Sequence, residues 1–387
     1  MKSIIEKKFT EVFEYGFEQT FASPGRINII GEHTDYNMGF VLPAAIDKCI
    51  YGSFAKKTNG SIRIYSYNYQ EFCEFKVSDI EAPKQQWAKY VYGITQEILK
   101  GIKSRDEFSK ISFDCVFGGD IPLGAGLSSS AALENLFSFA LNEIYHLGLI
   151  KEELAKIGQA CEHNYVGVKC GIMDQFASMM GEESKVIKLD CRNLDYSYFP
   201  FIQENMKIIL FDTKVKHSLA SSEYNVRRTE CEQGVEKMKK FYPKITSLRD
   251  VTIDQIDKHR ELLSGKEYDR CSYVVEENMR LFKACEALEK NDLKTFGTQI
   301  YRSHSGLQHK YEVSCIELDT LVYATKNVDG CYGARMMGGG FGGCTINFIR
   351  PDIEEVFINK ITKTFYNKLG KHPEVIGIQI GKGTHKL

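Results

Sequence analysis

Gly118–Glu134 reads GGDIPLGAGLSSSAALE and joins two stretches of different hydrophobic spacing. The preceding residues, 111–117, alternate apolar and polar side chains, which predicts a strand. Leu133, Phe137 and Ala140 then recur at helical spacing. The first amides of a helix lack internal partners and carry the positive end of its dipole, so this glycine-rich entry predicts an anion site suited to phosphate. Taken alone, the segment is equally compatible with a glycine turn and an ordinary serine N-cap.

The same loop lacks two common nucleotide-binding patterns. No Gly-Lys-Ser or Gly-Lys-Thr follows the glycines, as a Walker A loop requires. The third glycine of the dinucleotide-binding fingerprint is also missing. A phosphate site here would therefore be of another type.

The whole-chain composition is that of a folded protein whose net charge is close to zero. Its 387 residues suggest two domains, and 50 Lys and Arg against 51 Asp and Glu give a net charge of −1. This balance gives no electrostatic reason to bind nucleic acid or an anionic membrane. The 12 cysteines include no CxxC pair and predict buried thiols in a reducing compartment. The first 17 residues resemble an amphipathic helix rather than a signal peptide, and no 18-residue apolar stretch follows, so we expect a cytoplasmic protein.

Hydrophobic spacing predicts a mixed order of strands and helices. Strands are expected at residues 41–54, 62–75, 186–190 and 207–211. Helices are expected at residues 87–98, 152–164, 221–240, 269–289, 292–307 and 353–369, with a short one after residue 171. The turn-rich stretch before residue 207 predicts a boundary near residue 200, which gives an N-terminal domain of residues 1–200 and a C-terminal domain of residues 201–387.

A polar loop that contains glycines is expected at residues 23–39, SPGRINIIGEHTDYNMG. It carries Arg26, Glu32, His33 and Asp35 within ten positions. Carboxylates accept hydrogen bonds from hydroxyls, and imidazole donates or accepts them, which suits a polyol such as a sugar. Without further information a solvated polar loop is the better explanation, because loops are polar in any case.

Three further features carry candidate groups. Asp174 opens the apolar helix in CGIMDQFASMMG, where a carboxylate could take a proton from a substrate hydroxyl or simply oppose the helix dipole. Tyr224 and Arg228 share a helix face, which alone indicates ordinary helix surface. The glycine-rich stretch Gly333–Gly343 could press its backbone against a nucleotide or the loop at residues 23–39, or could form a tight strand turn.

Together these segments resemble, in order, the motifs of the GHMP kinases, a family that includes galactokinase, homoserine kinase, mevalonate kinase and phosphomevalonate kinase. SPGRINIIGEHTDYNMGFVLPAAID is similar to the galactokinase signature, GGDIPLGAGLSSSAALE to the ATP phosphate loop, and GARMMGGGFGGC to the third family motif. GIMDQFASMMG and SSEYNVRR also resemble galactokinase sequence. The resemblance extends from about residue 20 to the C-terminal strand.

The resemblance implies an α+β protein with the two-domain GHMP kinase fold. The N-terminal α/β domain would be of the ribosomal protein S5 domain 2-like type, the C-terminal domain would be ferredoxin-like, and the active site would lie between them. The implied activity is enzymatic transfer of the ATP γ-phosphate to the C1 hydroxyl of galactose, which gives galactose 1-phosphate and ADP.

The motif match also implies roles for particular residues. Asp174 would be the base, Arg26 would stabilise the transition state beside it, and Mg²⁺ would be the cofactor. The sugar would contact Glu32, His33, Asp35, Gly171 and Tyr224. The ATP phosphates would contact Gly124, Ala125, Gly126, Leu127, Ser128, Ser129 and Ser130. Ser130 and Glu162 would bind Mg²⁺, and Trp87 would lie near the adenine.

Two alternatives stay open at this point. One is a GHMP kinase for another sugar, such as N-acetylgalactosamine. The other is a non-catalytic sensor of galactose and ATP, which the intact GLSSSA sequence and Asp174 disfavour. We also expect a monomer. At four positions the chain departs from the usual family residue. It has Ala132 in place of Ser, Met337 in place of Thr, and Gly339 and Ser23 each in place of Ala.

Overall fold

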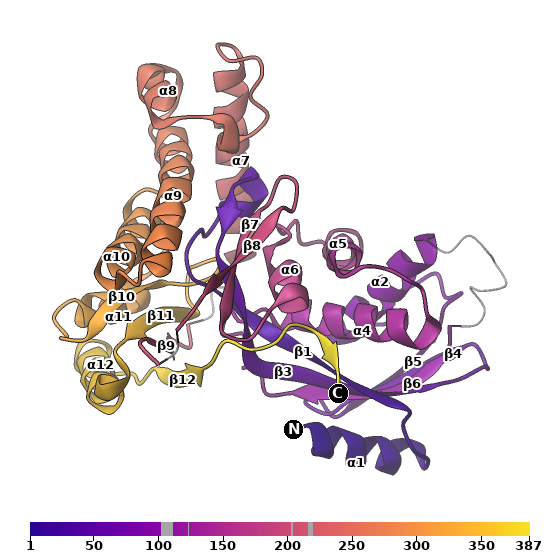
Figure 1. The fold of residues 1–387 in the computed structure, drawn as a ribbon. Helices are drawn as coiled ribbons and strands as arrows, with labels where there is room; N and C mark the ends of the chain where they lie inside the picture. Colours follow the sequence, from indigo (N-terminus) through magenta and orange to yellow (C-terminus); the bar gives the residue numbers. More distant parts are fainter. Residues whose placement is uncertain (102–110, 123, 203, 216–219) are drawn as a thin grey trace.

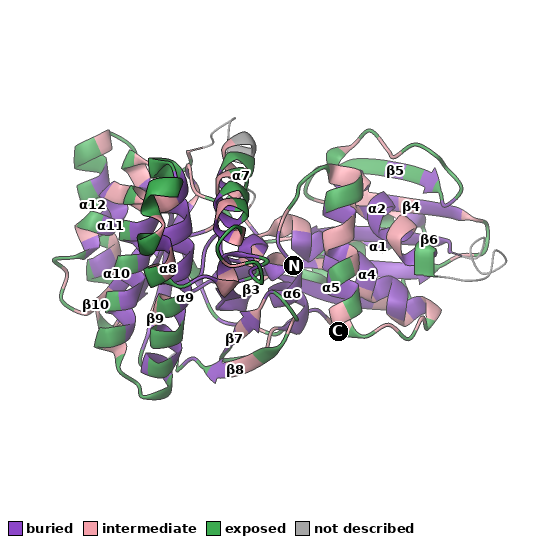
Figure 2. Cartoon of the chain, turned by 90° about the horizontal axis from the view of Figure 1, so that it is seen from above, coloured by how far each residue is buried: buried purple, intermediate pink, exposed green. Residues whose placement is uncertain are grey.

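The computed structural model describes residues 1–101, 111–122, 124–202, 204–215 and 220–387. Three β-sheets and the helices that cover them form two halves, which lie side by side in Figure 1. Buried residues gather where helices meet sheets, and exposed residues lie on the outer faces (Figure 2). Within the described ranges no helix is long and apolar enough to cross a membrane.

A six-stranded sheet organises the N-terminal half. Its strands, in spatial order, are β13 (His385–Lys386), β1 (Gln19–Asn28), β3 (Pro43–Lys56), β6 (Phe113–Gly119), β4 (Ser61–Ser66) and β5 (Glu71–Lys76). One face is covered by α1 (Lys2–Phe13). On the other side lie α2 (Gln86–Gly101), α4 (Ser129–Tyr145) and α6 (Met173–Met180), and α5 (Lys151–Cys161) packs on these three helices.

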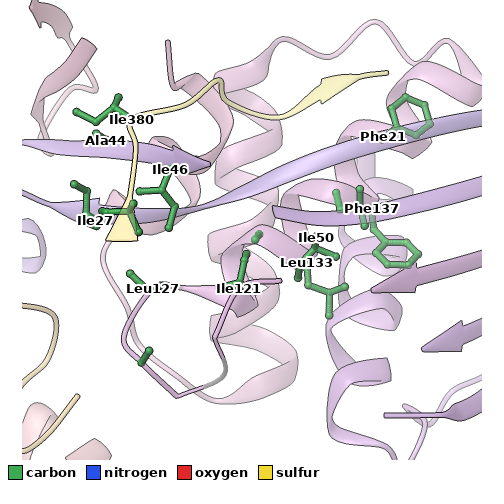
Figure 3. Packing of buried hydrophobic residues seen from close by; sticks show 14 of the residues in the cluster. Phe21, Ile27, Ala44, Ile46, Ile50, Ile121, Leu127, Leu133, Phe137 and Ile380 are labelled. Carbon is green, nitrogen blue, oxygen red and sulfur yellow. The ribbon is translucent and has the colours of Figure 1, made fainter. Parts of the chain in front are cut away.

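The main core lies between this sheet and α4. Phe21 on β1 and Phe137 on α4 point into it, together with Ile46 and Ile50 of β3 (Figure 3). Each large apolar side chain fully buried here contributes about 1.5–3 kcal/mol to folding. The core therefore fixes α4 against the sheet, and with it the loop that leads into α4.

The second half is built on an antiparallel four-stranded sheet. Its spatial order is β10 (Cys331–Met336), β11 (Cys344–Ile349), β9 (Lys207–Asp212) and β12 (Glu374–Ile378). Ile209 and Phe211 of β9 face α11 (Ile316–Thr325) and α12 (Glu354–Leu369), because alternate side chains of a strand point to opposite faces. The remaining helices of this half are α7 (Ala220–Lys239), α8 (Ile253–Lys258), α9 (Gly265–Glu289) and α10 (Leu293–His309).

The two ends of the chain meet in the first sheet. β13 pairs with β1 at Phe21 and Ala22, and Ile380 forms a bridge with Ile46 of β3. A small sheet of β2 (Phe40–Val41), β7 (Lys185–Asp190) and β8 (Tyr196–Pro200) lies beside the junction of the halves. The final residues thus pack on the N-terminal half, while a domain boundary near residue 200 stays a prediction.

The start of the expected polar loop at residues 23–39 is instead part of strand β1, which runs to Asn28 and is buried from Thr20 onward. The short polar side chain of Ser23 is satisfied inside the fold, with its Oγ 2.9 Å from Thr384 Oγ1 and 3.3 Å from Ser178 Oγ. The loop prediction was wrong here because these partners are distant in the sequence.

Other element boundaries also differ from the predictions. The strand expected at residues 62–75 is the pair β4 and β5, joined by a turn in which Gln70 has a positive φ of 54°. The strand expected at 41–54 is divided into β2 and β3, and the turn-rich stretch before residue 207 contains β8. Helices α8 and α11 and strand β12 were not predicted, since they are short.

Gly297 allows α10 to approach β10, and its substitution tests this packing. A Cβ at Gly297 would lie 1.8 Å from the backbone oxygen of Tyr332. We expect Gly297→Ala to lower the free energy of unfolding by about 1–3 kcal/mol, because a backbone atom must move. Denaturant unfolding measures this loss. Gly265→Ala is the control, since a Cβ there meets no atom within 4 Å; equal losses in both variants would refute the packing argument.

Candidate active site

An ion pair between strand β1 and helix α6 lies at the centre of the site. Arg26 Nε donates to Asp174 Oδ1 at 2.7 Å, and Arg26 Nη2 donates to Asp174 Oδ2 at 2.8 Å. The third guanidinium nitrogen, Nη1, donates to the Gly126 carbonyl at 2.6 Å. Arg26 is 5 % exposed, whereas the Asp174 side chain is 31 % exposed. The fold therefore brings together three distant segments and leaves the carboxylate within reach of a ligand.

The glycine-rich loop before α4 has an unusual start of helix. Ser128 is the N-cap residue of α4 and has a positive φ of 55°, but its hydroxyl makes no capping hydrogen bond. Ser128 Oγ instead donates to Asp174 Oδ2. The ordinary serine cap is thus excluded, and the first amides of α4 stay available to an anion. Ala125 and Leu127 bury their side chains in the core, so only their backbones could contact a phosphate.

Two cavities meet at the start of α4. The first, of about 350 Å³, is lined by Arg26, Glu32, His33, Asp35, Tyr90, Ser130, Glu162, Val168, Cys170, Gly171, Met173, Asp174, Gln175, Tyr224, Gly338 and Gly339. The second, of about 360 Å³, includes Trp87, Ser129 and Phe117 in its wall. Ser130 and Tyr90 line both cavities. A ligand in one cavity would therefore border a ligand in the other.

Every residue expected to contact the sugar lines the first cavity. Glu32 and His33 are only 2 % and 4 % exposed, so the solvated-loop interpretation is wrong for them. Glu32 Oε1 accepts hydrogen bonds from Gly338 N at 2.8 Å and from Arg335 Nη2 at 3.1 Å. The glycine-rich stretch between β10 and β11 is thereby fixed against the loop that follows β1. Of the two aligned side chains on α7, only Tyr224 reaches this cavity.

Gly171 and Asp35 are in close contact at the wall of the first cavity. A Cβ on Gly171 would lie 1.9 Å from Asp35 Oδ2, so a side chain here would displace the Asp35 carboxylate. Burial, with a smaller contribution from the charge of Asp174, raises the pKa of Asp35 to about 7. Asp35 is thus held where its charged form is unfavourable.

Glu162 belongs to η2, the single π-helical turn Glu162–Val166 that continues α5, where a regular helix had been expected. Such turns often occur at functional sites. Burial first, and then the charge of Asp174, raise the pKa of Glu162 to about 7, while a hydrogen bond from Ser130 acts against this rise. The hydroxyl and carboxylate expected to bind Mg²⁺ are therefore neighbours. Among the described residues, no three His, Cys, Asp or Glu side chains form a metal site by themselves.

A further acid, Glu134, lies behind this pair and was missed by the sequence analysis. It is fully buried, and its Oε2 accepts a hydrogen bond from Gln175 Nε2 at 2.9 Å. Burial, and then the charge of Glu162, raise the pKa of Glu134 well above its usual value. A carboxylate among the apolar residues of the first half of α4, one turn after Ser130, is the signal that could have identified it.

The second cavity contains Trp87, the residue expected near the adenine. Its indole Nε1 donates to Glu71 Oε2 at 2.7 Å, and its ring centroid lies 5.2 Å from that of Phe117. The cavity thus offers aromatic walls on one side and the start of α4 on the other. A flat ring joined to phosphate would suit this combination.

Comparison with known proteins agrees with this geometry. Residues 89–182 match the family model of the GHMP kinases N terminal domain, and residues 284–367 match the model of the GHMP kinases C terminal. Residues 7–56 match the galactokinase galactose-binding signature. The fold expected from the motifs, that of a GHMP kinase, is therefore confirmed.

Full-length relatives narrow the assignment. The chain is 40 % identical over 390 residues to a galactokinase of Lactiplantibacillus plantarum, with 100 % of this chain and 99 % of the relative covered. It is 38 % identical over 389 residues to a galactokinase of Clostridium acetobutylicum, with the same coverage. The crystal structure of Lactococcus lactis galactokinase complexed with galactose superposes with a TM-score of 0.94 at 34 % identity, covering 100 % of this chain and 99 % of that one. The chain therefore belongs to the galactokinase family.

The raised pKa of Asp35 predicts a pH-dependent cost of folding. Between the usual carboxyl pKa and about 7, the folded state binds the proton and the unfolded state does not, so stability falls as pH rises. Asp35→Asn removes this cost. We expect it to raise the thermal midpoint more at pH 8 than at pH 5, measured by differential scanning calorimetry.

Asp329→Asn is the matched control for this measurement, because the Asp329 side chain is 95 % exposed. We expect a small shift in its thermal midpoint that is the same at both pH values. An Asp35→Asn shift that is equally independent of pH would contradict the assigned burial cost.

Proposed function

We propose that this protein transfers the γ-phosphoryl group of ATP to the C1 hydroxyl of galactose, which gives galactose 1-phosphate and ADP. The observation that carries the proposal is the Asp174 carboxylate. It is held by Arg26 and Ser128 on the wall of the first cavity, which shares Ser130 with the second. Phosphoryl transfer depends mainly on positioning and charge neutralisation, and this arrangement supplies both.

In this proposal Asp174 accepts the proton of the attacking hydroxyl and orients its oxygen toward the phosphate. The guanidinium of Arg26 holds the Asp174 carboxylate in place and lies where negative charge develops on the transferred group. Because Ser128 bonds to the same carboxylate, the base is oriented before the substrate arrives.

The sugar would occupy the first cavity and the nucleotide the second. We propose that the sugar hydroxyls bind Glu32, His33, Asp35 and Tyr224, and that Gly171 gives the space that the sugar and Asp35 need. For the nucleotide, the backbone amides from Gly124 through Ser130 would hold the phosphates, with the adenine near Trp87. Buried, oriented polar groups of this kind discriminate strongly between hydroxyl patterns.

The residues present also fit a Mg²⁺ ion. The Ser130 hydroxyl and the Glu162 carboxylate are hard oxygen donors, and Mg²⁺ commonly takes its remaining ligands from phosphates and water. Burial and a neighbouring negative charge disfavour ionised Glu162, and a cation would relieve this. We propose that these two groups hold the ion, which when bound neutralises phosphate charge.

Asp174→Asn tests the role of the base. Asparagine keeps the shape and loses the charge, so we expect kcat to fall by about 10²–10⁴-fold. Steady-state kinetics would measure the loss, and circular dichroism would check that the variant is folded. Asp190→Asn is the control, because Asp190 also forms an ion pair, 3.0 Å from Arg249, but outside the first cavity. Near-normal turnover by Asp174→Asn would reject the assigned role.

A coupled assay of ADP release tests the reaction itself. We expect turnover with galactose and ATP, and much less with glucose, N-acetylgalactosamine or mevalonate. Preference for N-acetylgalactosamine would favour a kinase for that sugar, and binding of galactose and ATP without ADP release would favour a sensor. The monomeric state and the cytoplasmic location stay predictions.

A further inference from the structure

One nitrogen in the wall of the first cavity makes no hydrogen bond of normal geometry to the described residues, although the Gly339 carbonyl is near enough to raise the pKa of His33 against the larger effect of burial. His33 is 4 % exposed, and within the described part of the chain its Nε2 accepts or donates no hydrogen bond of normal geometry. Such unpaired buried groups are uncommon and call for an explanation. His33 also has a positive φ of 62°, and Asn37 Nδ2 donates to its carbonyl at 2.9 Å. Strain of this kind concentrates at functional sites.

A buried chain of hydrogen bonds extends from the other ring nitrogen. His33 Nδ1 lies 2.8 Å from Tyr36 Oη, and Tyr36 Oη lies 2.9 Å from Tyr311 Oη. Tyr311 Oη in turn lies 3.3 Å from Cys231 Sγ. These partners come from η1 (Asp35–Asn37), the segment after α10, and α7. All of them are buried, so water does not compete for these hydrogen bonds.

Each member of the chain carries a fixed number of protons. Burial lowers the pKa of His33 to about 3, against an opposing effect of the Gly339 carbonyl and with a smaller lowering by the charge of Arg227, so its ring is neutral and carries one proton. Burial raises the pKa of Tyr36 and Tyr311 well above the usual value, so each phenol keeps its single proton. The question is therefore which nitrogen of His33 is protonated.

Only two proton arrangements satisfy every bond in this hydrogen-bond chain and also use both phenol protons within it. In one, Cys231 donates to Tyr311, Tyr311 donates to Tyr36, and Tyr36 donates to His33 Nδ1; the ring proton is then on Nε2. In the other, all directions are reversed and the chain ends with a phenol donating to sulfur. The first arrangement is favoured, because imidazole nitrogen is a good acceptor whereas sulfur is a weak one.

We infer that Tyr36 and Tyr311 are positioning residues that fix His33 as the Nε2–H tautomer, so that it presents a hydrogen-bond donor to a hydroxyl oxygen of the sugar. That the ligand is a sugar rests on the proposed function. The tautomer itself rests only on the hydrogen-bond chain. Tyr36 and Tyr311 act through His33 and need no contact with the substrate.

The free protein allows a direct test. With ¹⁵N-labelled histidine, long-range ¹H–¹⁵N correlation separates the two tautomers by the shifts of the two ring nitrogens, and His33→Gln assigns the signal among nine histidines. We expect wild-type His33 to be wholly Nε2–H at pH 7. A wild-type Nδ1–H signal would overturn the inference without any need for a variant.

Tyr36→Phe removes the donor to Nδ1. We expect an Nδ1–H population to appear and KM for galactose to rise about 3–10-fold, the loss of one neutral hydrogen bond, with little change in KM for ATP. Tyr311→Phe should change both quantities in the same direction but less. Unchanged nitrogen shifts and unchanged KM for galactose in Tyr36→Phe would reject the positioning role.

Tyr273→Phe is the matched control. Tyr273 is as buried as Tyr311, and their rings pack with centroids 4.6 Å apart. Its hydroxyl, however, donates to the Glu32 carbonyl and is not part of the hydrogen-bond chain that begins at His33. We expect the His33 tautomer to be unchanged in this variant. Failure of wild-type protein to release ADP with galactose would reject the proposed function, while the nitrogen shifts would still decide the tautomer.

Discussion

The buried guanidinium of Arg26 is the constraint on which the site depends. A guanidinium shielded from water is costly unless its donors are met, and here Asp174 and the Gly126 carbonyl meet them. The same bonds connect β1, the loop before α4 and α6. The structural need to pair Arg26 therefore also determines where Asp174 points, and folding and catalytic geometry are satisfied by the same contacts.

Three largely buried carboxyl groups lie near the ion pair of Arg26 and Asp174. Glu134, Glu162 and Asp35 all have raised pKa values, and in each the largest cause is burial. Such groups lower the stability of the free protein. They concentrate at functional sites because function requires their perturbed pKa values. A ligand that brings positive charge or hydroxyl donors into the first cavity would recover part of this cost. The protein is therefore less stable with the first cavity empty than with such a ligand bound.

Local sequence pattern predicted part of this molecule well. The spacing of apolar residues identified α1, α2, α4, α9, α10 and α12, because one face of each helix is buried on its neighbours. The family motifs identified part of the lining of the first cavity, including Glu32, His33 and Tyr224, but not Tyr90 or Gln175. Pattern failed where tertiary contacts decide: residues 23–28 pair with β3 as a strand, the Ser23 hydroxyl bonds to Ser178 and Thr384, and Glu134 gains its surroundings from α5 and α6. The tyrosine chain behind His33 joins three segments and has no local signature.

The pairing of β13 with β1 has a consequence for how the chain folds during synthesis. Ser23 and Thr384, whose side chains bond at 2.9 Å, are separated by 361 positions, so the β1 edge of the first sheet stays open until residue 384 and its neighbours have been synthesised. An unpaired strand edge is prone to associate with other chains. Emergence of His385 and Lys386 from the ribosome, rather than formation of the early helices, therefore sets the moment at which the β1 edge is covered, and residues fused after Leu387 would lie next to that edge.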